Sequence, residues 1–132
     1  MEFYQHFAAS ILVGVTAFVL NSSDPIPAFA MAILGGSLID LDHFPLKYLE
    51  TGNWEHLEKA VQNPVKTVTE NEVLLGKHWL EPRKVMISHS IIVVSFTSSA
   101  LLLGSELMAI AAASSILHLL MDVFHDWRLG NL

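Results

Sequence analysis

Residues 107–125 have the sequence LMAIAAASSILHLLMDVFH, which is apolar over nearly its whole length. A helix of about 17–25 such residues is long enough to cross the hydrocarbon core of a bilayer. Three other stretches have the same apolar character, at residues 4–20, 25–40 and 85–103. The sequence therefore predicts an all-α fold, specifically a four-helix transmembrane bundle.

The composition supports a membrane protein of one integral membrane domain, residues 1–132. Hydrophobic residues make up 52% of the chain and charged residues only 15%, whereas soluble domains have about 25% charged residues. These values disfavour a soluble monomer and exclude a disordered chain. Two alternatives stay open: the apolar stretches form helices buried in a soluble core, or the first is a cleaved signal peptide. A signal peptide needs a positive N-terminal region, and no Lys or Arg precedes Lys47.

The charge and the residue types exclude other classes of function. A net charge of −6 argues against direct nucleic-acid binding, which requires a basic surface. The chain has no cysteine, which excludes disulfides, thiolate metal sites and cysteine nucleophiles. Seven histidines in 132 residues are the excess that needs an explanation.

A polar loop of about forty residues, 44–84, separates the second and third apolar stretches. Within it, residues 53–63 place apolar side chains at helical spacing, which predicts a short amphipathic helix along the membrane surface. An ordinary solvated helix is the alternative. Small residues are frequent in the four stretches, and they allow membrane helices to approach closely.

The basic residues indicate the orientation in the membrane. With four spans, the N-terminus, the loop 44–84 and the C-terminus lie on one face. All seven basic residues fall on that face: Lys47, Lys59, Lys66, Lys77, Arg83, Lys84 and Arg128. Because Lys and Arg concentrate in cytoplasmic loops, we expect a protein integral to the cell (inner) membrane with both termini cytoplasmic.

Ionisable residues gather at the cytoplasmic ends of all four predicted spans. Such groups are costly in a membrane and usually indicate function. The set is His6, Asp40, Asp42, His43, His89, His118, Asp122 and His125. Taken alone, His6 is typical of an interfacial histidine and His89 of a hydrogen-bonded core residue, so the functional interpretation depends on their convergence.

The fourth span carries three of these residues at helical spacing. His118, Asp122 and His125 follow one another at steps of four and three, which places them on one stripe of a helix. Imidazole and carboxylate are ligands for divalent metals when cysteine is missing. A satisfied buried pair, or a histidine stabilised by the helix dipole, is the alternative.

The second span ends in two aspartates and a histidine. Asp40 and Asp42 are two residues apart and so cannot face the same way on an α-helix. Both converge on one site only if the helix unwinds, and the nearby Gly35, Gly36 and Pro45 make a break plausible. The alternative is that these acids only solvate a helix end.

Together, the histidines and aspartates predict a metal centre built in a helical bundle. They are numerous enough for two ions, with Zn²⁺ as the first choice and Mn²⁺ or Fe²⁺ as alternatives. A paired metal centre clamps a phosphoester and activates water at neutral pH. The basic residues Arg83 and Lys84 lie at the same rim and could hold a substrate phosphate, although membrane anchoring explains them equally well.

The same residues carry a resemblance to the YdjM-type family of inner-membrane metal-dependent hydrolases. His6 fits the family's N-terminal histidine, residues 37–43 (SLIDLDH) fit its Leu-Pro-Asp-x-Asp-His with Ile39 in place of proline, and residues 88–90 (SHS) fit the end of its His-Arg-Gly-x-Thr-His-Ser. Residues 115–122 (SILHLLMD) fit its His-Leu-x-x-Asp. One departure is that the leading His-Arg of the third motif falls on Lys84 and Val85. The family is distantly similar to all-helical zinc phospholipases C and nucleases, which implies phosphoester hydrolysis.

Our leading hypothesis is a metal-dependent hydrolase at the cytoplasmic membrane face, acting on a phospholipid or another phosphoester. Its general base is an aspartate such as Asp42, or His125, and His6 is a ligand or proton shuttle. The proposed metal ligands are His6, Asp40, Asp42, His43, His89, His118 and Asp122. The alternatives are a small metal or proton transporter and a noncatalytic membrane protein stabilised by metal. The bilayer is the expected partner, and a homo-oligomer would bury the small-residue faces.

Overall fold

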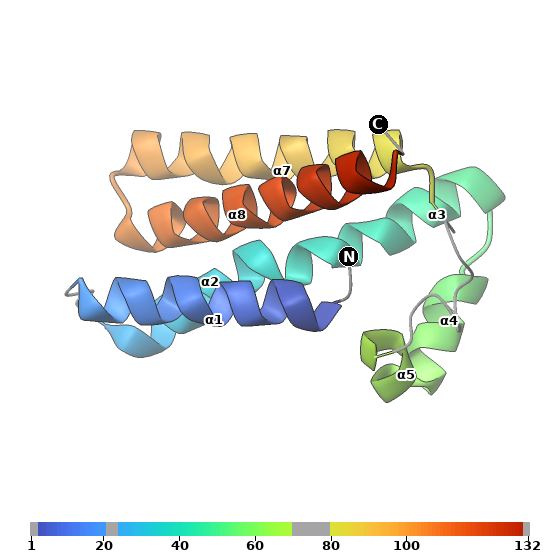
Figure 1. The fold of residues 1–132 in the computed structure, drawn as a ribbon, viewed down its shortest axis with the longest axis horizontal. Coiled ribbons are helices and arrows are strands. Elements are labelled where there is room, and N and C mark those ends of the chain that lie inside the picture. The colour runs from blue at the N-terminus through green and yellow to red at the C-terminus, as the bar shows by residue number, and fades with distance from the viewer. Residues whose placement is uncertain (1–2, 21–23, 70–79, 131–132) are drawn as a thin grey trace.

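The computed structural model describes residues 3–20, 24–69 and 80–130, and every regular element in these ranges is a helix (Figure 1). This confirms the predicted all-α class. The elements, in chain order, are α1 (Phe3–Val19), α2 (Pro25–Gly36), the 3₁₀-helix η1 (Leu38–Asp42), α3 (His43–Thr51), α4 (Glu55–Gln62), α5 (Pro64–Thr69), α7 (Pro82–Leu103) and α8 (Glu106–Leu129).

Two helices, α7 and α8, are long and apolar enough to cross a membrane. A third candidate is the pair formed by α2 and the helical segment Leu38–Thr51, which is bent by 47° at its break. The helix α1 is also apolar, but its apolar part, Tyr4–Val19, is shorter than a full membrane span. The four predicted apolar stretches therefore all fold as helices, and two of them have the full length of a membrane span.

Local sequence signals explain where these helices begin and end. Asp24 caps α2 by accepting a hydrogen bond from the backbone N–H of Ile26, and Ser105 caps α8 in the same way through Met108. Such caps satisfy N–H groups that have no partner within the helix. Gly104 ends α7 with φ of 59°, a left-handed conformation that glycine adopts readily.

The packing places α8 in the middle of the bundle. It contacts α7 on one side and α2 and α1 on the other, as Figure 1 shows. Ala28, Ala32 and Ala111 are fully buried between α2 and α8, and a side chain at Gly35 would overlap the backbone of Ala111. The predicted close approach of small residues is thus found at the contact of α2 with α8.

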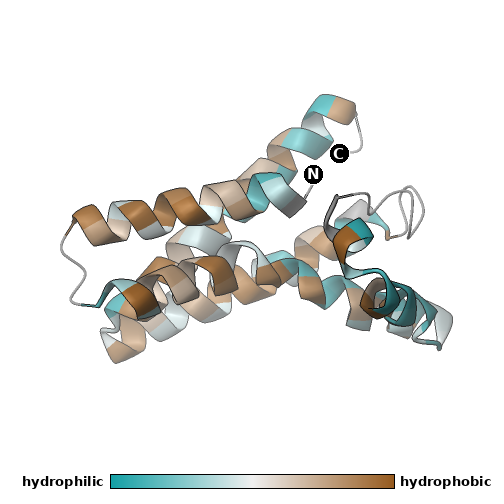
Figure 2. Ribbon diagram, turned by 90° about the horizontal axis from the view of Figure 1, so that it is seen from below, coloured by the Kyte–Doolittle hydropathy of each residue, from teal (hydrophilic) through white to brown (hydrophobic). Residues whose placement is uncertain are grey.

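The distribution of polar and apolar side chains is the reverse of that in a soluble domain. The largest fully buried side chains are histidines, namely His6, His89 and His118. Residues of high hydropathy predominate along the long helices (Figure 2), and many of their large apolar side chains are exposed, with Leu102 at 84%. Because water does not favour such a surface, this distribution suits surroundings of hydrocarbon.

One detail of the predicted loop 44–84 is corrected. Its first residues are not a loop, since α3 follows η1 directly and continues to Thr51. The predicted amphipathic helix at 53–63 is confirmed as α4, with α5 packed against it. Residues 70–79 of the predicted loop lie outside the described residues.

Candidate metal centre

The predicted interruption of the second helix is confirmed, and it delivers the two aspartates. The α-helix stops at Gly36 and gives way to the 3₁₀ turn Leu38–Asp42. In this tighter turn, Asp40 and Asp42 both approach the ring of His43, each with one carboxylate oxygen 3.7 Å from Nε2. The unwound segment therefore brings together side chains that a continuous α-helix would direct apart.

The broken end of α2 is completed by side chains from α8. A helix end leaves its last carbonyl groups without partners in the helix. Among these end carbonyls, that of Gly35 accepts a hydrogen bond from Ser115 at 2.7 Å, and the carbonyl of Ala32, about one turn earlier, accepts one from Ser114 at 2.7 Å. These buried contacts dock α8 against α2 and fix the position of the histidine one turn further along.

That histidine, His118, makes the next contact of the same series. Its Nδ1 lies 2.5 Å from the carbonyl oxygen of Gly36. Because a carbonyl can only accept, Nδ1 is the donor and a neutral ring carries its lone pair on Nε2. A histidine ligand is commonly oriented in this way by a backbone carbonyl.

The first group of candidate ligands consists of Asp40, His89, His118 and Asp122, whose ligand atoms all lie within 4.8 Å of one another. His118 Nε2 is 3.3 Å from Asp40 Oδ1 and 3.0 Å from Asp122 Oδ2. His89 Nδ1 is 3.4 Å from Asp122 Oδ2. Ligand atoms around a tetrahedral ion at about 2.1 Å are themselves separated by about 3.4 Å, which agrees with these distances.

Burial strengthens the case for a cation in this group. The side chains of His89 and His118 are 0% and 1% exposed, and His89 Nδ1 and His118 Nε2 have no hydrogen-bond partner among the residues that the structure describes. They face carboxylate oxygens without the alignment of a hydrogen bond. Buried polar atoms are costly without a partner, and a divalent ion among these atoms would satisfy all of them.

The second group consists of Asp42, His43 and His89. His89 Nε2 lies 3.3 Å from Asp42 Oδ1, and the hydroxyl of Ser88 donates a hydrogen bond to the other oxygen of Asp42. His89 therefore contacts both groups, through Nδ1 on one side and Nε2 on the other. Asp40 also reaches both, since its Oδ1 lies near His118 and His43.

His6 lies behind the first group rather than in it. Its Nε2 is 3.2 Å from Asp122 Oδ1, while the other oxygen of Asp122 faces His89 and His118. The ring of His6 also stacks on that of His118, with centroids 3.8 Å apart. The predicted convergence of His6 is found, in a position that orients a ligand.

His125 is not brought into either group. It lies on the same stripe as His118 and Asp122 but roughly 10 Å beyond His118 along the axis of α8. There its Nδ1 is 3.7 Å from the carboxylate of Asp126, and its side chain is 37% exposed. Helical spacing correctly predicted the pairing of His118 with Asp122, but it could not tell which residues of the stripe the side chains of other helices reach.

The two basic residues proposed as phosphate contacts lie outside both groups. Lys84 Nζ pairs with Glu50 of α3 at 2.7 Å and with Glu81 at 3.5 Å, and Arg83 is exposed. Glu50 also pairs with Lys47 at 3.1 Å. Sequence reasoning missed Glu50, because nothing in its local pattern indicates an ion pair between α3 and α7.

A second feature missed from the sequence is a buried pair of hydroxyls beneath the site. Ser10 and Ser37 are hydrogen-bonded at 2.9 Å, and Ser10 also donates to the carbonyl of His6. These bonds link the helix that carries His6 to the start of η1. The sequence signal for this hydroxyl pair is weak: Ser10 lies one helical turn after His6, on the same face of the helix.

Comparisons of the chain with protein-family models, with curated proteins and with solved structures find no match. The site is therefore characterised by its own geometry alone.

Proposed function

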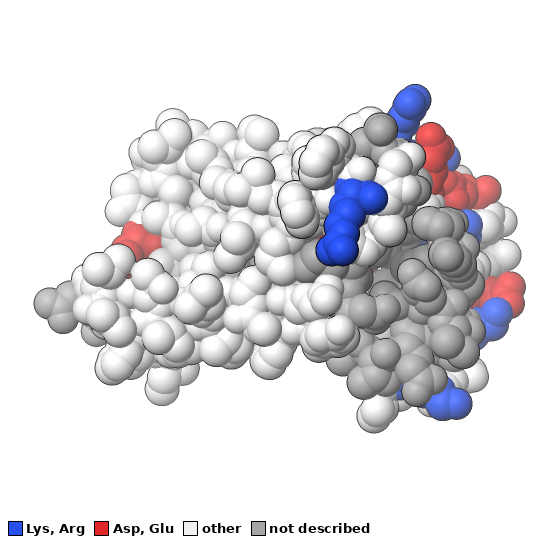
Figure 3. Space-filling model, in the orientation of Figure 1, with Lys and Arg blue, Asp and Glu red and all other residues white. Residues whose placement is uncertain are grey.

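We propose that this protein is a four-helix transmembrane bundle of the inner membrane. The supporting features are the apolar outer surface and the two helices of full spanning length. Lys and Arg side chains gather in the half of the molecule that carries α3, α4 and the C-terminal end of α8 (Figure 3). By the positive-inside rule, this half and both termini are cytoplasmic.

We further propose that the His/Asp cluster is the metal centre of a hydrolase acting on phosphoesters. The observation that carries this proposal is the pair of buried imidazole nitrogens, His89 Nδ1 and His118 Nε2. They face carboxylates at 3.0–3.4 Å and lack hydrogen bonds. The donor set of imidazoles and carboxylates suits Zn²⁺, with Mn²⁺ and Fe²⁺ as alternatives, and the second group gives room for a second ion.

A bound divalent ion supplies Lewis acidity, which makes both phosphorus and water more reactive. The chain's own residues position the reaction. The carbonyl of Gly36 fixes the tautomer of His118. The ring of His6 orients Asp122. The hydroxyl of Ser88 orients Asp42.

Asp42 is the general base in this proposal. It accepts one proton from the attacking water, whose oxygen forms a bond to phosphorus. The bond from phosphorus to the leaving oxygen breaks, and that oxygen takes the proton from Asp42. The products are the phosphomonoester and the alcohol of a phosphodiester, so atoms and charge balance.

The motifs shared with YdjM-type hydrolases support membership of that family. Lys84, where the family has a histidine, keeps open the alternative of a noncatalytic protein that is stabilised by metal. At the place of the family's histidine, Lys84 pairs with Glu50 rather than approaching the cluster. A metal that only stabilises the fold explains this arrangement and the burial of the histidines equally well. Turnover distinguishes the two functions.

The test combines metal analysis with kinetics. We expect the purified protein to retain close to one or two equivalents of Zn, Mn or Fe, and Asp122→Asn to lose most of it. Asp126→Asn, one turn further along α8, is the matched control and keeps its metal. A wild type that holds metal and cleaves bis(p-nitrophenyl) phosphate supports the hydrolase, and metal without turnover supports the structural ion. Equal metal contents in both variants would contradict the proposed site, and metal uptake into proteoliposomes would support the transporter instead of the hydrolase.

A further inference from the structure

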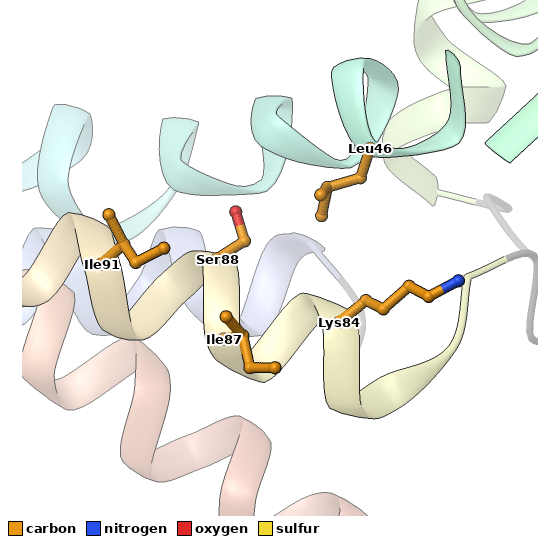
Figure 4. A pocket seen from close by; sticks show the side chains of 5 residues that line it. All are labelled: Leu46, Lys84, Ile87, Ser88 and Ile91. Atoms are coloured by element: carbon orange, nitrogen blue, oxygen red, sulfur yellow. The ribbon is translucent and has the colours of Figure 1, made fainter. Parts of the chain in front are cut away.

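A groove lies beside the candidate metal centre, between α3 and α7 (Figure 4). Leu46 extends into it from α3, and α7 contributes the rest of the lining, which is Lys84, Ile87, Ser88 and Ile91. The groove has a volume of about 240 Å³. Its lining is apolar except for the hydroxyl of Ser88, and Lys84 lies at one end with its ammonium group directed toward Glu50 and Glu81.

Ser88 connects this groove to the metal centre. Its hydroxyl lines the groove and is also hydrogen-bonded to Asp42. Asp42 in turn lies against His89 and His43. A molecule in the groove is therefore only one side chain away from the second group of candidate ligands.

The groove opens to the surface that faces hydrocarbon in the proposed membrane orientation. Only 6% of the apolar part of α7 is buried within the protein, and Ile87 and Ile91 are 63% and 62% exposed. An apolar groove open to hydrocarbon favours an alkyl chain over water. Pockets for drug-sized ligands have about 300–1,000 Å³, so this smaller groove takes a section of one chain rather than a whole lipid.

The polarity of the groove also gives the occupant a direction. Lys84 lies near the start of α7 and Ile91 two turns deeper along it. Lys84 is held by Glu50 and Glu81, so this end is polar and its charge is compensated. An amphiphile therefore fits with its polar group near Ser88 and its chain running toward the middle of α7.

We propose that the groove binds the alkyl chain of a membrane lipid that carries a phosphoester, and so presents the headgroup to the Asp42 side of the metal centre. This inference rests on the proposed function for the identity of the headgroup. The binding of the chain can be tested separately.

The first experiment measures binding without turnover and uses the natural absence of cysteine. Leu46→Cys places one thiol in the groove, and Val94→Cys places one on the same exposed side of α7 outside it. With the protein in amphipol, we expect decyl phosphate to slow maleimide labelling of Leu46→Cys at least fivefold and to leave Val94→Cys unchanged. Inorganic phosphate protects neither thiol. Equal protection of both thiols, or no protection of Leu46→Cys, overturns the inference.

The second experiment measures substrate selectivity. Ile87→Trp fills the groove, and Val94→Trp is the control of equal size. We expect Ile87→Trp to raise KM at least tenfold more for a decyl phosphodiester than for bis(p-nitrophenyl) phosphate, and Val94→Trp to change neither. An equal change on both substrates counts against a chain-binding groove. If the wild type cleaves neither substrate, the proposed hydrolase fails while the labelling result still decides whether the groove binds a chain.

Discussion

The imidazole of His118 donates its Nδ1 hydrogen to the carbonyl oxygen of Gly36, 2.5 Å away, and so directs Nε2 toward Asp40 and Asp122. That carbonyl is available only because α2 ends there. The same interruption exposes a backbone acceptor and begins the turn that carries both aspartates. The end of one helix therefore sets the tautomer of one candidate ligand and the position of two others.

We predict that His6→Ala weakens metal binding without abolishing it. His6 contacts Asp122 from behind and is in neither ligand group, and partners of this kind typically contribute 10–100-fold in metal affinity. Titration with a competing chelator measures the change. Phe7→Ala, at the neighbouring and partly exposed position, serves as the control. Complete loss of metal in His6→Ala would instead make His6 a ligand.

Removing the hydroxyl of Ser115 should destabilise the bundle. Ser115 is fully buried, and its Oγ bonds the carbonyl of Gly35 and, in its own helix, that of Ala111, so Ser115→Ala leaves the Gly35 acceptor unpaired at a cost of about 1–3 kcal/mol. Thermal unfolding in detergent reports the loss. Ser95→Ala removes only an exposed bond to Ile91 in its own helix and should shift the melting temperature much less. Similar shifts in the two variants would show that the contact of α8 with α2 does not depend on this bond.

A methyl group at Gly35 should be poorly tolerated. An added Cβ overlaps the backbone carbonyl of Ala111, and α8 would have to move away from α2. Overpacking of this kind costs typically about 1–3 kcal/mol. In Gly14→Ala the new Cβ approaches the ring of Phe29 at 2.6 Å, and a side chain can turn aside. We expect a lower melting temperature and less bound metal in Gly35→Ala than in Gly14→Ala, and the reverse order would refute the close contact.

The orientation in the membrane can be checked with single cysteines in this cysteine-free chain. A membrane-impermeant maleimide added to intact cells should label Asp24→Cys and Glu106→Cys, which lie at the starts of α2 and α8. It should label Lys59→Cys in α4 only after the inner membrane is opened. The opposite pattern would reverse the orientation, and labelling of all three in intact cells would contradict a four-span arrangement.

Much of the architecture could be predicted from the sequence because long apolar stretches leave the chain little choice except helix. The pairing of His118 with Asp122 followed from helical spacing. The interruption near Gly36 followed from two aspartates at a spacing that no α-helix can bring together. These inferences depend only on local sequence.

The features that could not be predicted depend on distances between elements. His125 has the correct angular position on α8, but it lies about two turns beyond His118, and its Nδ1 is 3.7 Å from Asp126. The hydrogen bond of Ser10 to Ser37 joins residues from two helices without any local pattern. The continuation of α3 to Thr51 was missed because its apolar residues are interrupted by Pro45, Lys47 and Glu50, and a long uninterrupted apolar stretch was the signal used to predict helices.

The short 3₁₀ turn between α2 and α3 also limits how this protein can be improved. Replacing residues 37–39 and 41 with strong helix formers, and keeping both aspartates, would favour a continuous and more stable α-helix here. The same repair would remove the free carbonyl beneath His118 and turn one aspartate away from the other. Stability of the helix and assembly of the candidate metal centre therefore oppose each other at this turn, and we expect selection for thermal stability alone to favour variants that lose the cluster.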